Sequence, residues 1–239
     1  MNIFGTFTRG ARALAPACMI ALAPLSGLAQ GDGPPQEVFL PKSQKGPVVI
    51  VISGASGPLN YKHYGAQLAG IGYYAVLIDG KDILTRMQDD GAQNLRTVIT
   101  KAQASPNAVP GKVAVVGFSQ GGGGVLAHAV VMPELINSAV AYYPSVSWVR
   151  SNIAGLAGRI QIPVLVLAAE RDRFNNCCLI ETIRELESAA RAKQLPLELV
   201  VYPNAYHGFN LDGRTYRAAD TDDAWRRTTE MLARHHPVK

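Results

Sequence analysis

The sequence Val-Ala-Val-Val-Gly-Phe-Ser-Gln-Gly-Gly-Gly-Gly, residues 113–124, decides how the rest of the chain folds. Its first four residues are apolar and mostly β-branched, which is typical of a strand buried on both faces of a sheet. The strand leads directly into Gly-Phe-Ser-Gln-Gly at 117–121, the Gly-x-Ser-x-Gly pattern of a nucleophile elbow. In such an elbow the serine occupies a sharp, strained turn from strand to helix, so its neighbours must be small. The sequence therefore predicts Ser119 as a nucleophile.

The four consecutive glycines at 121–124 fall in the first turn of a helix predicted at 120–131. Each interior glycine costs a helix about 1 kcal/mol relative to alanine, so a run of four indicates a steric requirement. A flexible glycine-rich loop or a phosphate-binding loop is the alternative. A P-loop ends in Gly-Lys-Ser/Thr, and a dinucleotide-binding loop needs a Gly-x-Gly-x-x-Gly frame with an acidic residue after the next strand. Neither pattern fits well here, so the nucleophile elbow is favoured.

The composition is that of one folded domain. The chain has 239 residues, 48% of them hydrophobic, which is enough for one sizeable core and too little for two ordinary domains that each carry a site. The formal net charge is +5. Basic residues occur singly or in pairs, without the basic stripe and interleaved aromatic residues of a nucleic-acid interface. We therefore expect no nucleic-acid partner.

Residues 1–29 have the features of a secretory signal peptide, with a basic head, an apolar middle and small residues at the end. The apolar run is about 16 residues long and contains two prolines, which is short for a membrane span. A lipoprotein signal that uses Cys18 is the alternative. We expect an exported protein, periplasmic or secreted, without stable membrane insertion once the signal is removed. A flexible lead-in at 30–46 then precedes a single domain at 47–239.

Strand and helix patterns alternate along the mature chain. Strands are predicted at 38–40, 48–53, 73–78, 113–116, 138–143, 162–168 and 197–201. Helices are predicted at 61–71, 90–104, 120–131, 179–193 and 218–235. This alternation predicts an α/β fold with a mostly parallel, doubly wound sheet and helices on both faces. Residues 145–161 lack clear periodicity, and we expect them to lie over the top of the sheet as a minimal cap.

Two further residues follow predicted strands in the order that a serine hydrolase needs. Asp172 comes just after the penultimate strand, and His207 lies in the loop after the last one. Both are thereby expected at the carboxyl edge of the sheet, where Ser119 also lies. In the α/β-hydrolase fold the order along the chain is Ser, then Asp or Glu, then His. Glu170 is an alternative to Asp172, because the end of a predicted strand is defined only to within about two residues.

The role of each residue follows from its chemistry. A serine hydroxyl is a weak nucleophile at its free pKa, so His207 is expected to accept the Ser119 proton and later to deliver it to the leaving group. Asp172 is expected to hold the imidazole in the required tautomer and to stabilise its cation. The oxyanion hole is expected to use the backbone N–H groups of Gln120 and of Ala55, which lies in the glycine-rich turn after an early strand. This chemistry uses neither a metal nor a cofactor.

The mature chain contains two adjacent cysteines, Cys177 and Cys178, at the start of a predicted helix. A helix N-terminus lowers a thiol pKa, so a cysteine nucleophile is an alternative to Ser119. Neither cysteine lies on an elbow, however, and neither has an oxyanion N–H that the sequence identifies. Two cysteines are also too few for a structural zinc site. We expect them to form a buried pair or a vicinal disulfide.

Taken together, the motifs resemble the dienelactone hydrolase family, and specifically its exported members. The resemblance covers most of the mature chain and rests on the segments 48–57, 70–79, 117–122, 163–172, 201–209 and 223–228. It implies an α/β-hydrolase fold and hydrolytic activity. The name-giving enzymes have a cysteine at the elbow, where this chain has Ser119, and this departure points away from dienelactone cleavage itself.

The residues favour an exported serine hydrolase that cleaves a carboxylic ester or lactone of a small molecule through an acyl-enzyme. The Phe-Ser-Gln-Gly sequence at the elbow is also found in acyl-thioesterases and lysophospholipases, which are an alternative activity. A catalytically inactive binding protein with an α/β-hydrolase fold is a further hypothesis. The complete Ser, Asp, His order argues against it.

Overall fold

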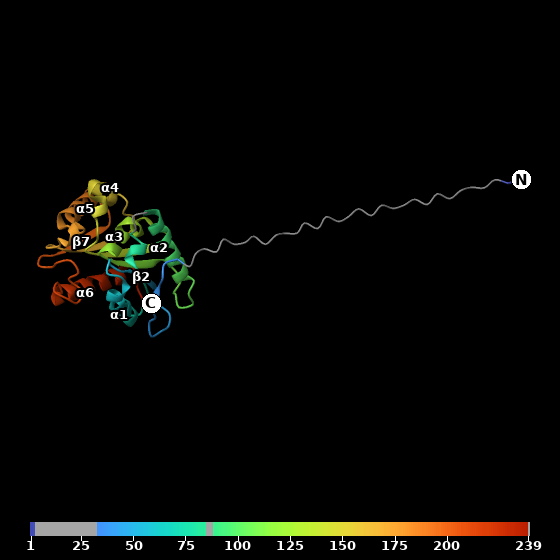
Figure 1. Cartoon of the computed structure of the whole chain (residues 1–239). Coiled ribbons are helices and arrows are strands. Elements are labelled where there is room, and N and C mark those ends of the chain that lie inside the picture. The colour runs from blue at the N-terminus through green and yellow to red at the C-terminus, as the bar shows by residue number, and fades with distance from the viewer. Residues whose placement is uncertain (3–32, 85–87, 239) are drawn as a thin grey trace. The chain divides into compact units, whose positions relative to one another are not determined.

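The computed structural model describes residues 1–2, 33–84 and 88–238. The signal peptide predicted at 1–29 therefore lies outside the described residues, except for its first two. From Asp32 onward the chain forms one compact unit built on a seven-stranded sheet (Figure 1).

The sheet has the strand order β1-β3-β2-β4-β5-β6-β7. The strands are Glu37–Phe39 (β1), Val48–Ile52 (β2), Tyr74–Ile78 (β3), Val113–Phe118 (β4), Ile136–Tyr142 (β5), Val164–Ala169 (β6) and Leu197–Tyr202 (β7). Strand β1 pairs antiparallel with β3, and the other neighbouring pairs are parallel. The predicted α/β class with a mostly parallel sheet is confirmed.

Helices cover both faces of the sheet, with α1 and α6 on one face and α3, α4 and α5 on the other (Figure 1). The α-helices are Lys62–Gly70 (α1), Gln88–Gln103 (α2), Gln120–Ala127 (α3), Ile153–Ala157 (α4), Ile180–Ala192 (α5) and Ala218–His235 (α6). Short 3-10 helices are Pro58–Tyr61 (η1), Gly80–Asp82 (η2), Ala129–Val131 (η3), Ser147–Asn152 (η4) and Phe174–Asn176 (η5). Within the described part of the chain, none of the helices combines the length and the apolar composition needed to cross a membrane.

Alternate residues of each central strand enter two separate cores. In β2, Val48, Ile50 and Ile52 pack in the core beneath α2 to α5. Val49 and Val51 pack in the opposite core, against α1 and α6. All five side chains are fully buried. A continuous apolar sequence is therefore required here, because a strand that is covered on both faces has no position left for a polar side chain.

The predicted lead-in at 30–46 already contains part of the sheet. Its central residues Glu37–Phe39 form β1, and Gly46 forms a parallel bridge with Ala108. The short strand expected in this stretch is present, and the domain begins before the boundary expected at 47. The reason is that β1 pairs with β3 and so forms the edge strand of the sheet.

The stretch 145–161 packs against the core instead of lying over the top of the sheet. Part of it forms η4 and α4, and Ile153, Leu156 and Ile160 are buried in the core that contains α5. The spacing of these three residues is helical, although α4 itself is only 5 residues long. As a result, the carboxyl edge of the sheet keeps only a minimal cap.

His236 fastens the end of the chain to the amino end of the sheet. Its Nε2–H donates to the Val48 carbonyl oxygen at 2.8 Å, and its Nδ1 lies 2.9 Å from Nδ2 of Asn137. The Tyr73 hydroxyl donates to the His236 carbonyl oxygen at 3.0 Å. Burial lowers the pKa of His236, and the hydrogen bond to Val48 opposes this shift in part. The ring is therefore held in the neutral form.

We predict that the free energy of unfolding falls as the pH drops below about 6.5, the ordinary pKa of histidine. Because the folded-state pKa of His236 is lowered, the unfolded chain takes up more protons below that pH, and stability present above it is lost. Urea unfolding at about pH 8 and about pH 5.5 measures the loss. The His236→Gln variant should be less stable at the higher pH and lose less on acidification; an equal loss in both proteins would contradict the prediction.

Candidate active site

Ser119 lies at the sharp turn between β4 and α3. Its backbone has φ 49° and ψ -110°, which is outside the conformations that residues with a side chain normally adopt. The Ser119 N–H donates to the Tyr142 carbonyl oxygen at 2.9 Å, and the Gly121 N–H donates to the Ser53 carbonyl oxygen at 3.1 Å. These bonds to the ends of β5 and β2 hold the strained turn, as a nucleophile elbow requires.

The glycines after the serine let the backbone of α3 approach its neighbours. A Cβ on Gly121 would overlap the carbonyl oxygen of Ile52, and one on Gly123 would overlap that of Ser145. A Cβ on Gly117 would overlap the Gly121 carbonyl oxygen. The glycine run therefore has a steric cause, which is the contact of the first turn of α3 with the end of β2 and the loop after β5.

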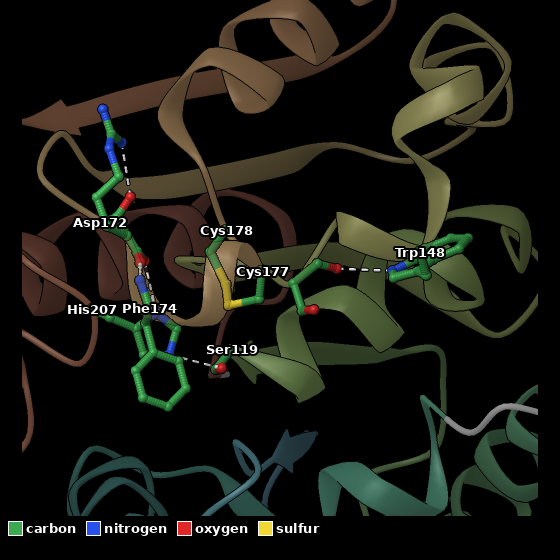
Figure 2. Close-up of a disulfide and its surroundings, with 9 residues drawn as sticks. Ser119, Trp148, Asp172, Phe174, Cys177, Cys178 and His207 are labelled. Atoms are coloured by element: carbon green, nitrogen blue, oxygen red, sulfur yellow. Dashed lines mark hydrogen bonds and ion pairs between the residues drawn. A yellow bond between two sulfur atoms is a disulfide. The ribbon is translucent and has the colours of Figure 1, made fainter.

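The structure brings together the three side chains that the sequence predicts for catalysis. Ser119 Oγ lies 2.9 Å from His207 Nε2, and His207 Nδ1 lies 2.7 Å from Asp172 Oδ2 (Figure 2). Asp172 follows β6 and is fully buried, whereas the side chain of His207, which follows β7, is 15% exposed. In the tautomer that satisfies both contacts, Nδ1–H donates to Asp172 and Nε2 accepts from the serine hydroxyl.

Asp172 rather than Glu170 lies beside the imidazole. The second oxygen of Asp172, Oδ1, accepts the Phe174 backbone N–H at 3.0 Å, so both carboxylate oxygens are fixed. Glu170 points to the surface and pairs with Arg184, with an N–O distance of 2.6 Å. The alternative acid is therefore engaged elsewhere.

Two aromatic rings fix the plane of the His207 imidazole. Phe174 stacks on it with a centroid distance of 4.6 Å and an interplanar angle of 10°, and Tyr143 meets its edge at 4.8 Å. Phe174 belongs to η5 and is 52% exposed, so its ring shields one face of the imidazole from solvent. Phe174 was not predicted from the sequence. The signal available was an aromatic residue two positions after Asp172.

The two residues whose backbone amides are predicted for an oxyanion hole, Gln120 and Ala55, both lie in segments next to Ser119. Gln120 is the first residue of α3, so its N–H has no acceptor within the helix. Ala55 is exposed in the turn after β2. The preceding residue, Gly54, approaches Ser119 so closely that a Cβ on it would lie 3.2 Å from the Ser119 Cβ. The turn that carries Ala55 therefore lies against Ser119.

Tyr61, at the end of η1, supports this turn and was not predicted from the sequence. A Cβ on Gly54 would overlap its hydroxyl, which places the phenol directly beside the turn. Burial raises the pKa of Tyr61, while hydrogen bonds with Ser56, Tyr143 and the Gly54 backbone lower it in part. The phenol therefore stays protonated at neutral pH and links the turn to the aromatic core.

A cavity of about 620 Å³ lies beside the same turn, with which it shares Ser56. Other residues of its lining are Leu59, His63, Tyr64, Asp212, Tyr216, Asp222 and Trp225. Its walls thus combine aromatic rings with carboxylates. His63 is exposed and belongs to this lining.

Cys177 and Cys178 form a vicinal disulfide next to His207 (Figure 2). Their sulfur atoms and a ring nitrogen of His207 all lie within 4.8 Å of one another. Of the two expectations from the sequence, the disulfide is the one observed. Neither sulfur is a thiolate in this state, so neither is available as a nucleophile.

The fold and the placement of the serine, acid and histidine after β4, β6 and β7 define an α/β-hydrolase. Residues 36–236 match the dienelactone hydrolase family, and the chain belongs to that family. A Salmonella typhi protein named "Putative carboxymethylenebutenolidase" is 31% identical over 232 residues, covering 86% of this chain and 84% of the relative.

Solved structures show the same fold. The crystal structure titled "Putative Dienelactone Hydrolase" from Klebsiella pneumoniae has a TM-score of 0.74 and 24% identity, covering 86% of this chain and 95% of that one. Esterase 2 of Thermogutta terrifontis, phosphonylated by cyclosarin, has a TM-score of 0.68 and 18% identity, covering 85% and 89%.

We predict that Gly121→Ala destabilises the fold by about 1–3 kcal/mol, because the new methyl group overlaps the backbone of β2. Gly70→Ala is the matched control, since a Cβ on this last residue of α1 meets no atom within 4 Å. This control should be neutral or should stabilise by up to about 1 kcal/mol. Urea unfolding compares the two variants, and equal stabilities would show that the elbow tolerates a side chain.

Proposed function

We propose that this protein is a serine hydrolase that cleaves a carboxylic ester or lactone of a small molecule through an acyl-enzyme. The proposal rests on two hydrogen bonds. One links Ser119 Oγ, at the nucleophile elbow, to His207, and the other links His207 to Asp172. Membership of the dienelactone hydrolase family supports hydrolysis of such bonds. A small-molecule substrate is supported by the cavity of about 620 Å³ that shares Ser56 with the turn carrying Ala55.

In the proposed reaction, Ser119, His207 and Asp172 each carry out one part of the chemistry. His207 Nε2 accepts the proton as Ser119 Oγ attacks the carbonyl carbon, and Asp172 stabilises the resulting imidazolium. The negative oxygen of the tetrahedral intermediate faces the free N–H of Gln120 and the turn that carries Ala55. His207 then protonates the leaving alcohol, and water attacks the acyl-enzyme by the same route in reverse.

Export is the second part of the proposal. The signal-like sequence at 1–29 supports secretion or a periplasmic location. The disulfide between Cys177 and Cys178 adds support, because disulfides persist in oxidising compartments and are rare in the cytosol.

Replacement of the nucleophile tests the activity. Ser119→Ala should lower the hydrolysis of a chromogenic acetyl ester at least ~1,000-fold, because the remaining groups supply only binding and oxyanion stabilisation. The fold should be retained or slightly more stable, since strain at such a turn costs on the order of 1–3 kcal/mol.

A fluorophosphonate should label Ser119 of the wild-type protein, as judged by mass spectrometry of the digested chain. The phosphonylated state of the Thermogutta esterase supports this choice of probe. Label found on a cysteine, or a Ser119→Ala variant with a tenth of the wild-type rate, would refute the assignment.

The triad acid is tested by a matched pair of carboxylate variants. Asp172→Asn should lower kcat by on the order of 10,000-fold, because the amide oxygen stays on the Phe174 N–H and the NH₂ group faces Nδ1, which favours the wrong tautomer. Glu170→Gln should change kcat less than about 3-fold, since it removes only a surface ion pair with Arg184. The reverse ranking would make Glu170 the acid.

A further inference from the structure

We propose that the Cys177–Cys178 disulfide is a redox-controlled metal site. When the disulfide is reduced, the two thiolates and Nε2 of His207 bind one thiophilic divalent cation such as Zn²⁺. The bound cation then blocks hydrolysis by occupying the imidazole. The inference rests on the proposed function only for this last effect, since metal binding itself is independent of the hydrolytic activity.

The three ligand atoms already converge. One ligand atom from each of Cys177, Cys178 and His207 lies within 4.8 Å of the others. A tetrahedral zinc ion with Zn–S of about 2.3 Å and Zn–N of about 2.0–2.1 Å holds its ligand atoms roughly 3.5–3.8 Å apart. Rotation of the side chains after the S–S bond opens is sufficient to reach this spacing. The third ligand comes from a distant loop, which is why two cysteines in the sequence did not indicate a zinc site.

The chemistry of the donors favours a soft or borderline dication. Two thiolates and one imidazole form a Cys₂His set, which zinc uses with water as the fourth ligand. The two thiolate charges neutralise the dication in a site where Cys178 is only 3% exposed. A disulfide sulfur carries no such charge and binds metals poorly, so the site exists only after reduction.

The hydrogen-bond partner of His207 Nδ1 suits a metal ligand as well as a catalytic base. A histidine that binds zinc normally donates its other ring N–H to a carboxylate or carbonyl, which fixes the tautomer. Asp172 provides this partner, with Nδ1 to Oδ2 at 2.7 Å. Nε2 is left to face Ser119 Oγ at 2.9 Å, and a cation on Nε2 would replace that contact. The same nitrogen therefore serves either the serine or the metal.

The backbone of the cysteine pair is anchored independently of the S–S bond. The Cys177 carbonyl oxygen accepts the N–H groups of Val146 at 2.8 Å and Ser147 at 3.0 Å. In the loop that supplies these donors, the indole N–H of Trp148 donates to the Ser145 carbonyl oxygen at 2.8 Å (Figure 2). Opening the disulfide therefore frees the two side chains while the backbone stays next to His207.

The redox step is a two-electron exchange with a dithiol reductant. The reductant passes two electrons and two protons to the pair and becomes a disulfide, while Cys177 and Cys178 become thiols. Zn²⁺ then binds with release of the two thiol protons. Oxidation by a disulfide partner reverses the sequence and expels the cation.

The test compares the oxidised protein with protein reduced by a phosphine and desalted under nitrogen. Co²⁺ is the spectroscopic probe, because thiolate ligands give it charge-transfer absorption. The reduced protein should show this absorption, saturating at one Co²⁺ per chain, and the oxidised protein should not. Zn²⁺ should displace the Co²⁺ and lower ester hydrolysis on the order of 100-fold, since the base becomes unavailable, with recovery on addition of a chelator.

Variants assign the ligands by Co²⁺ absorption. A Cys177→Ser, Cys178→Ser double variant should show no band in either redox state. His207→Ala keeps the reduced cysteine pair but should bind Co²⁺ more weakly, by at least ~10-fold. His63→Ala, which changes a histidine in the cavity by the oxyanion turn, is the matched control and should bind as the wild type does.

A reduced wild-type protein without the thiolate band, or a band unchanged in His207→Ala, would overturn the metal site. A protein that hydrolyses no ester but shows the band would refute the proposed function and support the site. Circular dichroism of each variant shows that the fold is retained, and His207→Ala keeps the test decisive if the double variant does not fold.

Discussion

The site depends on a single strained turn, the one that presents Ser119 between β4 and α3. Its backbone conformation costs on the order of 1–3 kcal/mol, and it persists because neighbouring strands hold it on both sides. The Tyr142 carbonyl binds the turn from β5, and the Ser53 carbonyl binds it from the end of β2. Glycines must follow the serine because these same strands approach the first turn of α3 so closely. The parallel sheet therefore holds Ser119 in this strained conformation.

Much of this arrangement could be predicted because the signals are local. A fully buried strand such as β2 must be apolar throughout, and a residue just after a parallel strand must lie at its carboxyl edge. Those two rules placed Ser119, Asp172 and His207 on one edge. These two rules do not distinguish Asp172 from Glu170. The distinction depends on Arg184 of α5, which forms an ion pair with Glu170 away from the imidazole.

The features that escaped prediction depend on contacts between distant segments. Phe174 stacks on His207 because the loop after β6 reverses direction at Asn175, whose φ is 46°. The sequence does not predict this conformation. Tyr61 supports the oxyanion turn through its hydroxyl, which no periodicity reveals. The pairing of β1 with β3 involves only three residues on each strand, and α4 has five residues, too few for a clear helical period.

The hydrogen bond between His236 and Val48 affects the order in which the fold is completed. These two residues are 188 positions apart, and the contact joins the first long strand to the last few residues of the chain. Because synthesis starts at the N-terminus, Val48 is made long before His236. The hydrogen bond that His236 gives to the amino edge of the sheet can therefore form only after the rest of the sheet has been synthesised.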